Sequence, residues 1–485
     1  MYIAIKELIP SQPRAAHAAV SAQDAPAAPF SFAALYGRLA HHIPTPQERA
    51  AGAQWLRAAL ERSADEEDDL PQDPAALLAW VQANTEKVHA QYQTYLEGRK
   101  AGAPRSYFSH RAHALYFLRC VAPTKLVDGA WLYGLCAHAG NARLADLVTT
   151  YVEELGDGQA GKNHVTLYRE LLTRYGLDPL EDLPDALYEQ GLVQVALGWN
   201  AQDFLPEIVG FNLGYEQLPL HLLITAYELN ELGIDPYYFT LHVTVDNADT
   251  GHARRACNAA LEAAPRMDEG GDYWRRVRAG AKLGNAGVST LDVIHGFDIE
   301  REVVAIFARK AQAGHGAHSD FCKVAGRSVN DWLSSAEHLP EFLAALQATH
   351  WIERDQPVQN SRFWRLLEGE RAEMFGVFSP YELQLIHDWI RGAASVDGVS
   401  YATLSEPGAP KRQISFRVAE RLKAARNAVP EQGPAPGLDT DLEIFKQRYP
   451  TLGAGEQRDL LVQAMSPALH WTPVGLLATQ LFLQR

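Results

Sequence analysis

The feature that most constrains the fold is a series of apolar helical segments, joined by short breakers, between residues 109 and 264. Apolar residues recur there with the period of a helix. Glycine and proline punctuate the joints. The section has neither alternating strands nor a strand–helix–strand rhythm. We therefore expect an all-α bundle, with helices over 141–155, 163–175, 183–197, 201–215, 218–233 and 237–264.

The flanking sequence also reads as mostly helical. Pro46 and Pro74 stand where the first turn of a helix tolerates proline. Residues 351–353 and 361–367 are expected to form a short strand pair. The expected division of the chain is a flexible N-terminal arm at 1–29, a helical N-terminal region at 30–108, the bundle at 109–270, a mostly helical accessory region at 271–427, a proline- and glycine-rich linker at 428–440 and a C-terminal helical segment at 441–485.

Charge, cysteine spacing and missing motifs exclude several classes of function. The 485-residue chain carries a net charge of −15, whereas nucleic-acid binding requires a concentrated basic surface, so we expect no nucleic-acid partner. The four cysteines form no CxxC pair, which argues against a thiolate zinc site. The sequence also lacks GxGxxG and GxxxxGK[ST] phosphate loops and the GxSxG nucleophile elbow.

The expected location is the cytoplasm. A few scattered cysteines are typical of a reducing cytosol. The start MYIAIKELIPSQPR lacks the basic residues and long apolar core of a signal peptide. No stretch approaches the about 20 apolar residues of a membrane helix. We therefore expect no membrane partner.

Acids and imidazoles recur within the predicted bundle. Asp128 and Glu216 stand in apolar surroundings, and buried acids are rare unless they are paired or bind a metal. Glu154 and His164 flank a glycine-containing loop, so they belong to two elements that can converge. The alternatives are a salt bridge or an exposed position for each isolated acid, and a solvated helix end for Glu154.

A third segment carries His242, Asp246 and Asp249. Spacings of four and three residues place such side chains on one face of a helix. Burying this set is costly unless a cation or other partners neutralise it. The alternative is the polar face of a surface helix, although the neighbouring residues are apolar. His252 lies about a quarter-turn away on an ideal helix, and Gly251 would permit a local distortion.

The ordered set over residues 109–264 resembles the haem-oxygenase-like diiron oxidases and oxygenases, also described as iron-containing redox enzymes. In that family, an acid on an early core helix precedes a Glu that is followed ten residues later by a His. Asp128 stands at the first place, and Glu154 and His164 match the pair. A bridging Glu on a later helix is matched by Glu216.

The last helix of the family pattern carries a His, an Asp four residues on, and often a second His three residues further. His242 and Asp246 match the first two positions. Two departures stand out. Asp128 replaces a longer Glu, and Asp249 replaces the final His, although His252 follows one turn later.

The resemblance implies a haem-oxygenase-like helical bundle with additional helical flanks. It implies an enzyme that uses O₂ and iron as Fe(II) and Fe(III), with two ions expected, to perform N-oxygenation, desaturation or oxidative C–C cleavage in a biosynthetic pathway. The expected partner is a small amino-acid-like substrate, and the flanks are candidates for forming a homodimer. We expect no catalytic residue beyond the metal ligands, which are Asp128, Glu154, His164, Glu216, His242, Asp246, Asp249 and His252.

Two other hypotheses remain open from the sequence. The degenerate first and last ligand positions would also suit a non-catalytic helical scaffold or regulator. A cofactorless helical oxidase of related shape is the other alternative. The sequence does not identify the substrate. The candidate contacts are residues of a type that more often packs in a core than touches a substrate: Tyr215, His221, Tyr227, Tyr237 and Tyr238.

Overall fold

A computed structural model describes residues 30–177, 182–245, 251–266, 271–314, 316, 318–319, 321–368, 372–392 and 439–485. The expected N-terminal arm lies outside the described residues. So do residues 393–438, which include the end of the accessory region and most of the expected linker. The division into domains stays a prediction.

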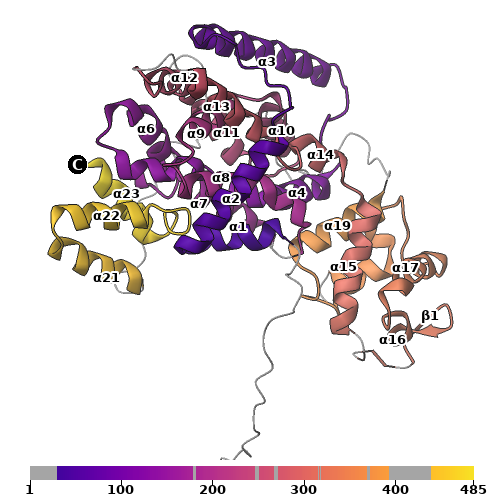
Figure 1. The fold of residues 1–485 in the computed structure, drawn as a ribbon. Helices are drawn as coiled ribbons and strands as arrows, with labels where there is room; N and C mark the ends of the chain where they lie inside the picture. Colours follow the sequence, from indigo (N-terminus) through magenta and orange to yellow (C-terminus); the bar gives the residue numbers. More distant parts are fainter. Residues whose placement is uncertain are drawn as a thin grey trace, which may run out of the picture. The chain divides into compact units, whose positions relative to one another are not determined.

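Helices make up nearly all of the regular structure in the described part of the chain (Figure 1). The prediction of an all-α fold is confirmed. The first α-helices are α1 (Phe32–Ala40), α2 (Pro46–Arg62), α3 (Leu77–Lys100), α4 (Arg111–Cys120), α5 (Ala122–Lys125), α6 (Ala145–Glu154), α7 (His164–Arg174), α8 (Glu189–Trp199), α9 (Leu205–Tyr215), α10 (Leu220–Glu231), α11 (Tyr237–Val245), α12 (His252–Glu262) and α13 (Gly271–Lys282).

The remaining elements follow the bundle. The later α-helices are α14 (Thr290–His295), α15 (Ile299–Gly314), α16 (Val329–Trp332), α17 (Leu339–Ala348), α18 (Arg362–Leu367), α19 (Pro380–Arg391), α21 (Thr440–Arg448), α22 (Ala454–Ala464) and α23 (Pro473–Leu483). Short 3-10 helices are η1 (Pro74–Ala76), η2 (Ala130–His138), η3 (Ala142–Leu144), η4 (Gly156–Gly158), η5 (Asp185–Tyr188), η6 (Leu283–Asn285), η7 (Ala336–His338), η8 (Val358–Asn360) and η10 (Tyr449–Thr451). None of the helices described is long and apolar enough to cross a membrane.

The predicted strand pair at 351–353 and 361–367 is wrong. Residues 362–367 form helix α18, because Phe363, Trp364 and Leu367 share one face at helical spacing and all three are buried. The only sheet among the described residues is a short antiparallel pair elsewhere, formed by β1 (Lys323–Val324) and β2 (Arg327–Ser328).

Two expectations within the bundle also need correction. The predicted helix over 237–264 is not continuous, because Gly251 has an extended backbone (φ −85°, ψ −165°) and α12 begins after it at His252. Asp128 does not lie inside a helix. It occupies the turn between α5 and η2, where Gly129 has a left-handed backbone with a φ of 78°.

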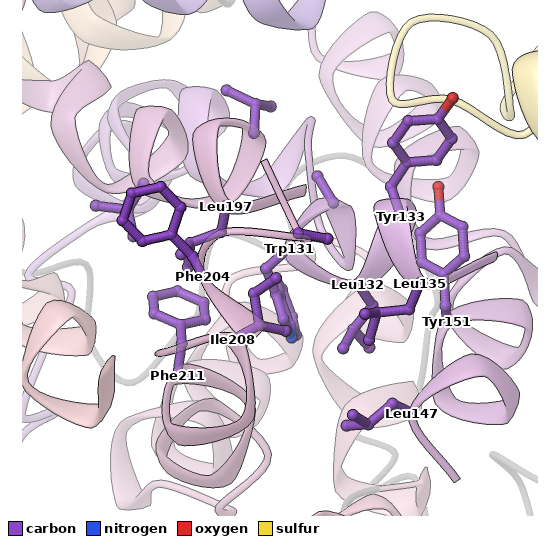
Figure 2. Packing of buried hydrophobic residues seen from close by; sticks show 14 of the residues in the cluster. Trp131, Leu132, Tyr133, Leu135, Leu147, Tyr151, Leu197, Phe204, Ile208 and Phe211 are labelled. Atoms are coloured by element: carbon purple, nitrogen blue, oxygen red, sulfur yellow. The ribbon is translucent and has the colours of Figure 1, made fainter. Parts of the chain in front are cut away.

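The core of the bundle is built around Trp131 of η2, which packs against α8 and α9 (Figure 2). Its ring lies edge-on to Phe211, with 5.4 Å between the ring centroids. Its indole Nε1 donates a hydrogen bond of 2.9 Å to Asn212 Oδ1, so the one polar atom of this buried ring is satisfied. This packing fixes α9, whose C-terminal end leads directly into Glu216.

Helices α9 and α13 approach so closely that only glycine fits between them. A Cβ atom added at Gly210 of α9 would overlap the carbonyl oxygen of Val277, and one added at Gly280 of α13 would overlap the backbone of Glu207. In contrast, a Cβ atom at Gly214, one turn further along α9, would lie 3.8 Å from its nearest neighbour.

We predict opposite effects for two alanine substitutions in α9. Gly210→Ala should lower the free energy of unfolding by about 1–3 kcal/mol, because the new methyl group forces α13 away. Gly214→Ala should leave stability unchanged or raise it by up to about 1 kcal/mol, because alanine favours helix. Denaturant unfolding of both variants tests this, and equal stability of the two would contradict the close packing.

Candidate metal centre

Two groups of potential ligands lie in the bundle interior. The first consists of Asp128, Glu154, His164 and His242, each of which offers one ligand atom within 4.8 Å of the others. The second consists of Glu154, Glu216 and His252 by the same measure. All six side chains are buried. Glu154 is common to both groups, although the family resemblance assigned the bridging position to Glu216.

In the first group, the carboxylates and imidazoles lie in direct contact. His164 Nδ1 is 2.5 Å from Glu154 Oε2 and 3.8 Å from Asp128 Oδ2. His242 Nε2 is 3.1 Å from the same Asp128 oxygen. The four side chains come from three helices and the turn before η2, so the folded bundle is needed to assemble them.

In the second group, His252 faces two carboxylates. Its Nδ1 atom is 3.1 Å from Glu216 Oε2 and 3.3 Å from Glu154 Oε1. Glu154 therefore presents Oε2 to the first group and Oε1 to the second. A carboxylate with one oxygen directed toward each of two sites has the arrangement of a bridging ligand.

Most of these side chains stand at the ends of helices. Glu154 is the last residue of α6, His164 is the first residue of α7, and His252 is the first residue of α12. Glu216 directly follows α9. Close packing at the turn that carries Asp128 also requires glycine, because a Cβ atom on Gly129 would lie 2.9 Å from Glu154 Cβ.

Neighbouring acceptors orient two of the imidazoles. His242 Nδ1 lies 2.8 Å from the carbonyl oxygen of Tyr238, so a proton on Nδ1 would leave Nε2 as the atom that faces Asp128. His252 Nε2 lies 2.9 Å from Glu153 Oε2, so Nδ1 is the atom that faces Glu154 and Glu216. Such partners are typical of histidines that bind metals, because they fix the tautomer and the ring orientation.

The charges at the site favour ionised carboxylates. Burial acts to raise the pKa of Asp128, but the positive charge of Lys125 and the hydrogen bond with His242 hold that pKa below its usual value. Burial opposes ionisation of Glu154 as well, yet His164 and His252 hold its pKa well below the usual range. Ionised acids in an apolar interior are costly to bury, and a bound cation would compensate that cost.

The donor set fits iron. Carboxylate oxygens and imidazole nitrogens suit ferrous and ferric ions, and neither group contains a thiolate. The first group offers two oxygens and two nitrogens, and the second offers two oxygens and one nitrogen. The expected ligands Asp246 and Asp249 lie outside the described residues.

The roles of two residues at this site were not identified from the sequence. Glu153 looks like a solvated helix-end acid, yet it contacts His252 and also forms a 2.8 Å ion pair with Arg255. Tyr238 was named only as a candidate contact, and its hydroxyl donates a 2.5 Å hydrogen bond to Asp128 Oδ2. Burial, followed by the charge of Asp128, raises the pKa of Tyr238 well above its usual value, so the phenol stays a donor.

The other candidate contacts lie at different distances from the site. The charges of Asp128 and Glu216 both act on the Tyr215 hydroxyl, which accepts a hydrogen bond from Gln194. His221 lies near Lys125. Tyr227 packs against Tyr95 of α3, and Tyr237 lines a small surface pocket beside Tyr238.

Comparison with known proteins places this geometry in context. Residues 115–285 match the family model of iron-containing redox enzymes. The resemblance to this haem-oxygenase-like family is thereby confirmed. Both ligand groups lie within the matched segment. No curated protein and no solved structure matches the chain. The family match and the buried ligand groups together support iron as the metal and a redox enzyme as the class.

We predict that the Tyr238 hydroxyl contributes more to stability than that of its neighbour Tyr168. Both rings are buried, but the hydroxyl of Tyr168 donates to the neutral carbonyl oxygen of Leu118. Tyr238→Phe should therefore cost about 1.5–3 kcal/mol and Tyr168→Phe about 1 kcal/mol in unfolding of metal-free protein. A smaller loss for Tyr238→Phe would show that Asp128 is not the ionised acceptor.

Proposed function

We propose that the chain is an O₂-dependent non-haem iron oxidase or oxygenase with two irons at the candidate centre. The observation that carries the proposal is the pair of buried ligand groups that share Glu154. A non-catalytic scaffold would gain nothing from enclosing several acids in an apolar bundle, because such burial destabilises the fold unless a cation compensates it.

In this proposal, Asp128, His164 and His242 would hold one iron and Glu216 and His252 would hold the other, while Glu154 would serve both because it belongs to both groups. Two ferrous ions would supply the electrons that reduce O₂ and the oxidising power for N-oxygenation, desaturation or oxidative C–C cleavage. Glu153 and the Tyr238 carbonyl orient two of the imidazoles. The buried apolar surroundings exclude water from the site.

We propose a small amino-acid-like metabolite as the substrate. The support comes from Lys125, which forms no ion pair within the described residues although its charge acts on Asp128. Its ammonium group lies 5.8 Å from the centroid of the Tyr238 ring. Burial and this same charge lower the pKa of His221 to about 4. A substrate carboxylate would find in Lys125 a cation placed beside the centre.

The metal assignment predicts a specific pattern of iron stoichiometry. Wild-type protein, titrated with Fe(II) under anaerobic conditions with and without a panel of amino acids, should bind two ions. Asp128→Asn and Glu216→Gln should each retain one ion, because each removes a ligand of a single group. Glu154→Gln should weaken both sites. A wild-type protein without iron affinity would refute the proposal and favour a scaffold, and O₂ consumption that persists after chelation would favour a cofactorless oxidase.

The substrate assignment predicts a selective effect of Lys125→Met. The variant keeps the apolar stem but loses the charge, so the KM for a carboxylate-bearing substrate should rise about tenfold to a hundredfold, as expected for the loss of a charge-assisted hydrogen bond. The KM for the corresponding carboxamide should not change, and iron stoichiometry should stay at the wild-type value. Equal effects on the acid and the amide would contradict a carboxylate contact.

A further inference from the structure

The C-terminal helices pack against the loop that joins two of the proposed ligands. Residues 155–163 connect Glu154, at the end of α6, to His164, at the start of α7. This loop contains η4, and η4 contacts α23. Gln480 of α23 donates a 2.8 Å hydrogen bond to the carbonyl oxygen of Gly158.

The loop contains three consecutive residues with a left-handed backbone, and the middle one is not a glycine. Gly156, Asp157 and Gly158 all have left-handed φ values, of 64°, 54° and 76°. Asp157 is not a glycine, so its conformation costs energy that the surroundings must compensate. A Cβ atom on Gly158 would lie 2.5 Å from the carbonyl oxygen of Leu476, so the loop and the C-terminal segment are in close contact there.

Asn163 connects the two ends of the loop. The residue is fully buried, and its Oδ1 atom caps α7 by accepting a 2.9 Å hydrogen bond from the Thr166 amide. Its Nδ2 atom donates to the carbonyl oxygen of Leu155, at 3.3 Å. Leu155 follows Glu154 and Asn163 precedes His164, so this one amide group links the backbone beside both ligands.

His470, which lies in the C-terminal segment, contacts the side-chain amide of Asn163. Asn163 Nδ2 lies 3.2 Å from His470 Nδ1, although 307 residues separate the two in sequence. His470 is buried, and its burial and the charge of Arg169 lower its pKa to about 3, so the ring is neutral and Nδ1 can accept the bond. Two further contacts support this junction. Tyr151 of α6 donates to the Met465 carbonyl at 2.6 Å, and Arg169 of α7 stacks on Trp471 at 3.8 Å.

We propose that the C-terminal segment, residues 439–485, positions the bridging ligand Glu154 and the neighbouring ligand His164, and that Asn163 and His470 are the positioning residues. The inference rests on the proposed metal centre. Helices α6 and α7 both receive contacts from this segment next to the ligands. Because a metal site requires its ligands within about 0.5 Å of the productive geometry, a loose loop would weaken metal binding without unfolding the bundle.

The test compares three variants of the full-length chain. His470→Leu removes the side-chain acceptor and leaves only the backbone carbonyl of residue 470, which lies 3.4 Å from Asn163 Nδ2. His470→Asn keeps a side-chain acceptor near the place of Nδ1. Thr479→Val is the matched control, because the Thr479 side chain is equally buried in α23 but bonds only within that helix, to the Gly475 carbonyl. The readouts are hydrogen–deuterium exchange of the amides at 156–163 in metal-free protein and the affinity for Fe(II) under anaerobic conditions.

His470→Leu should speed up exchange in the loop and weaken Fe(II) binding by at least about tenfold, which is the usual cost of removing support behind a ligand. His470→Asn should restore most of both properties, and Thr479→Val should change neither. Wild-type exchange and affinity in His470→Leu would overturn the inference. If wild-type protein binds no Fe(II), the proposed function fails, and the exchange of the loop alone then decides whether His470 holds it.

Discussion

The structure depends on the burial of carboxylates around Glu154. Enclosing a charged group in an apolar bundle costs several kcal/mol unless partners or a cation compensate it. The observed contacts supply part of that compensation: the Tyr238 hydroxyl and His242 bond Asp128, while His164 and His252 face Glu154. A cation held between the two groups would supply further compensation, which is why the site could hold a metal.

The helical fold and most of the side chains that gather in the two candidate ligand groups could be predicted because both leave local signals. Helical periodicity is visible in short windows, and the ordered acids and histidines keep the types and spacing of the iron-containing family. Gly251 was the only sequence signal for the helix break before His252, because the rest of that segment favours one continuous helix. The turn at Asp128 was also missed, because its apolar neighbours are equally compatible with a helix.

The membership of Glu154 in both candidate groups could not be predicted, because it depends on how the end of α6 is oriented between two other elements. The residues that orient the candidate ligands were harder to predict. Glu153 resembles any acid at a helix end, and its contact with His252 spans 99 residues. Asn163 is recognisable as a helix cap, but its partner His470 lies 307 residues further along the chain, in a segment without a ligand pattern.

The central claim is that two irons lie between these side chains and share Glu154. Anomalous X-ray scattering from a crystal loaded with Fe(II) under anaerobic conditions, with data on both sides of the iron absorption edge, tests it most directly. The account predicts two iron peaks, one beside His164 and His242 and one beside His252, with a Glu154 oxygen toward each. No iron peak at either group, in a crystal where the acids and imidazoles bond one another directly, would contradict it.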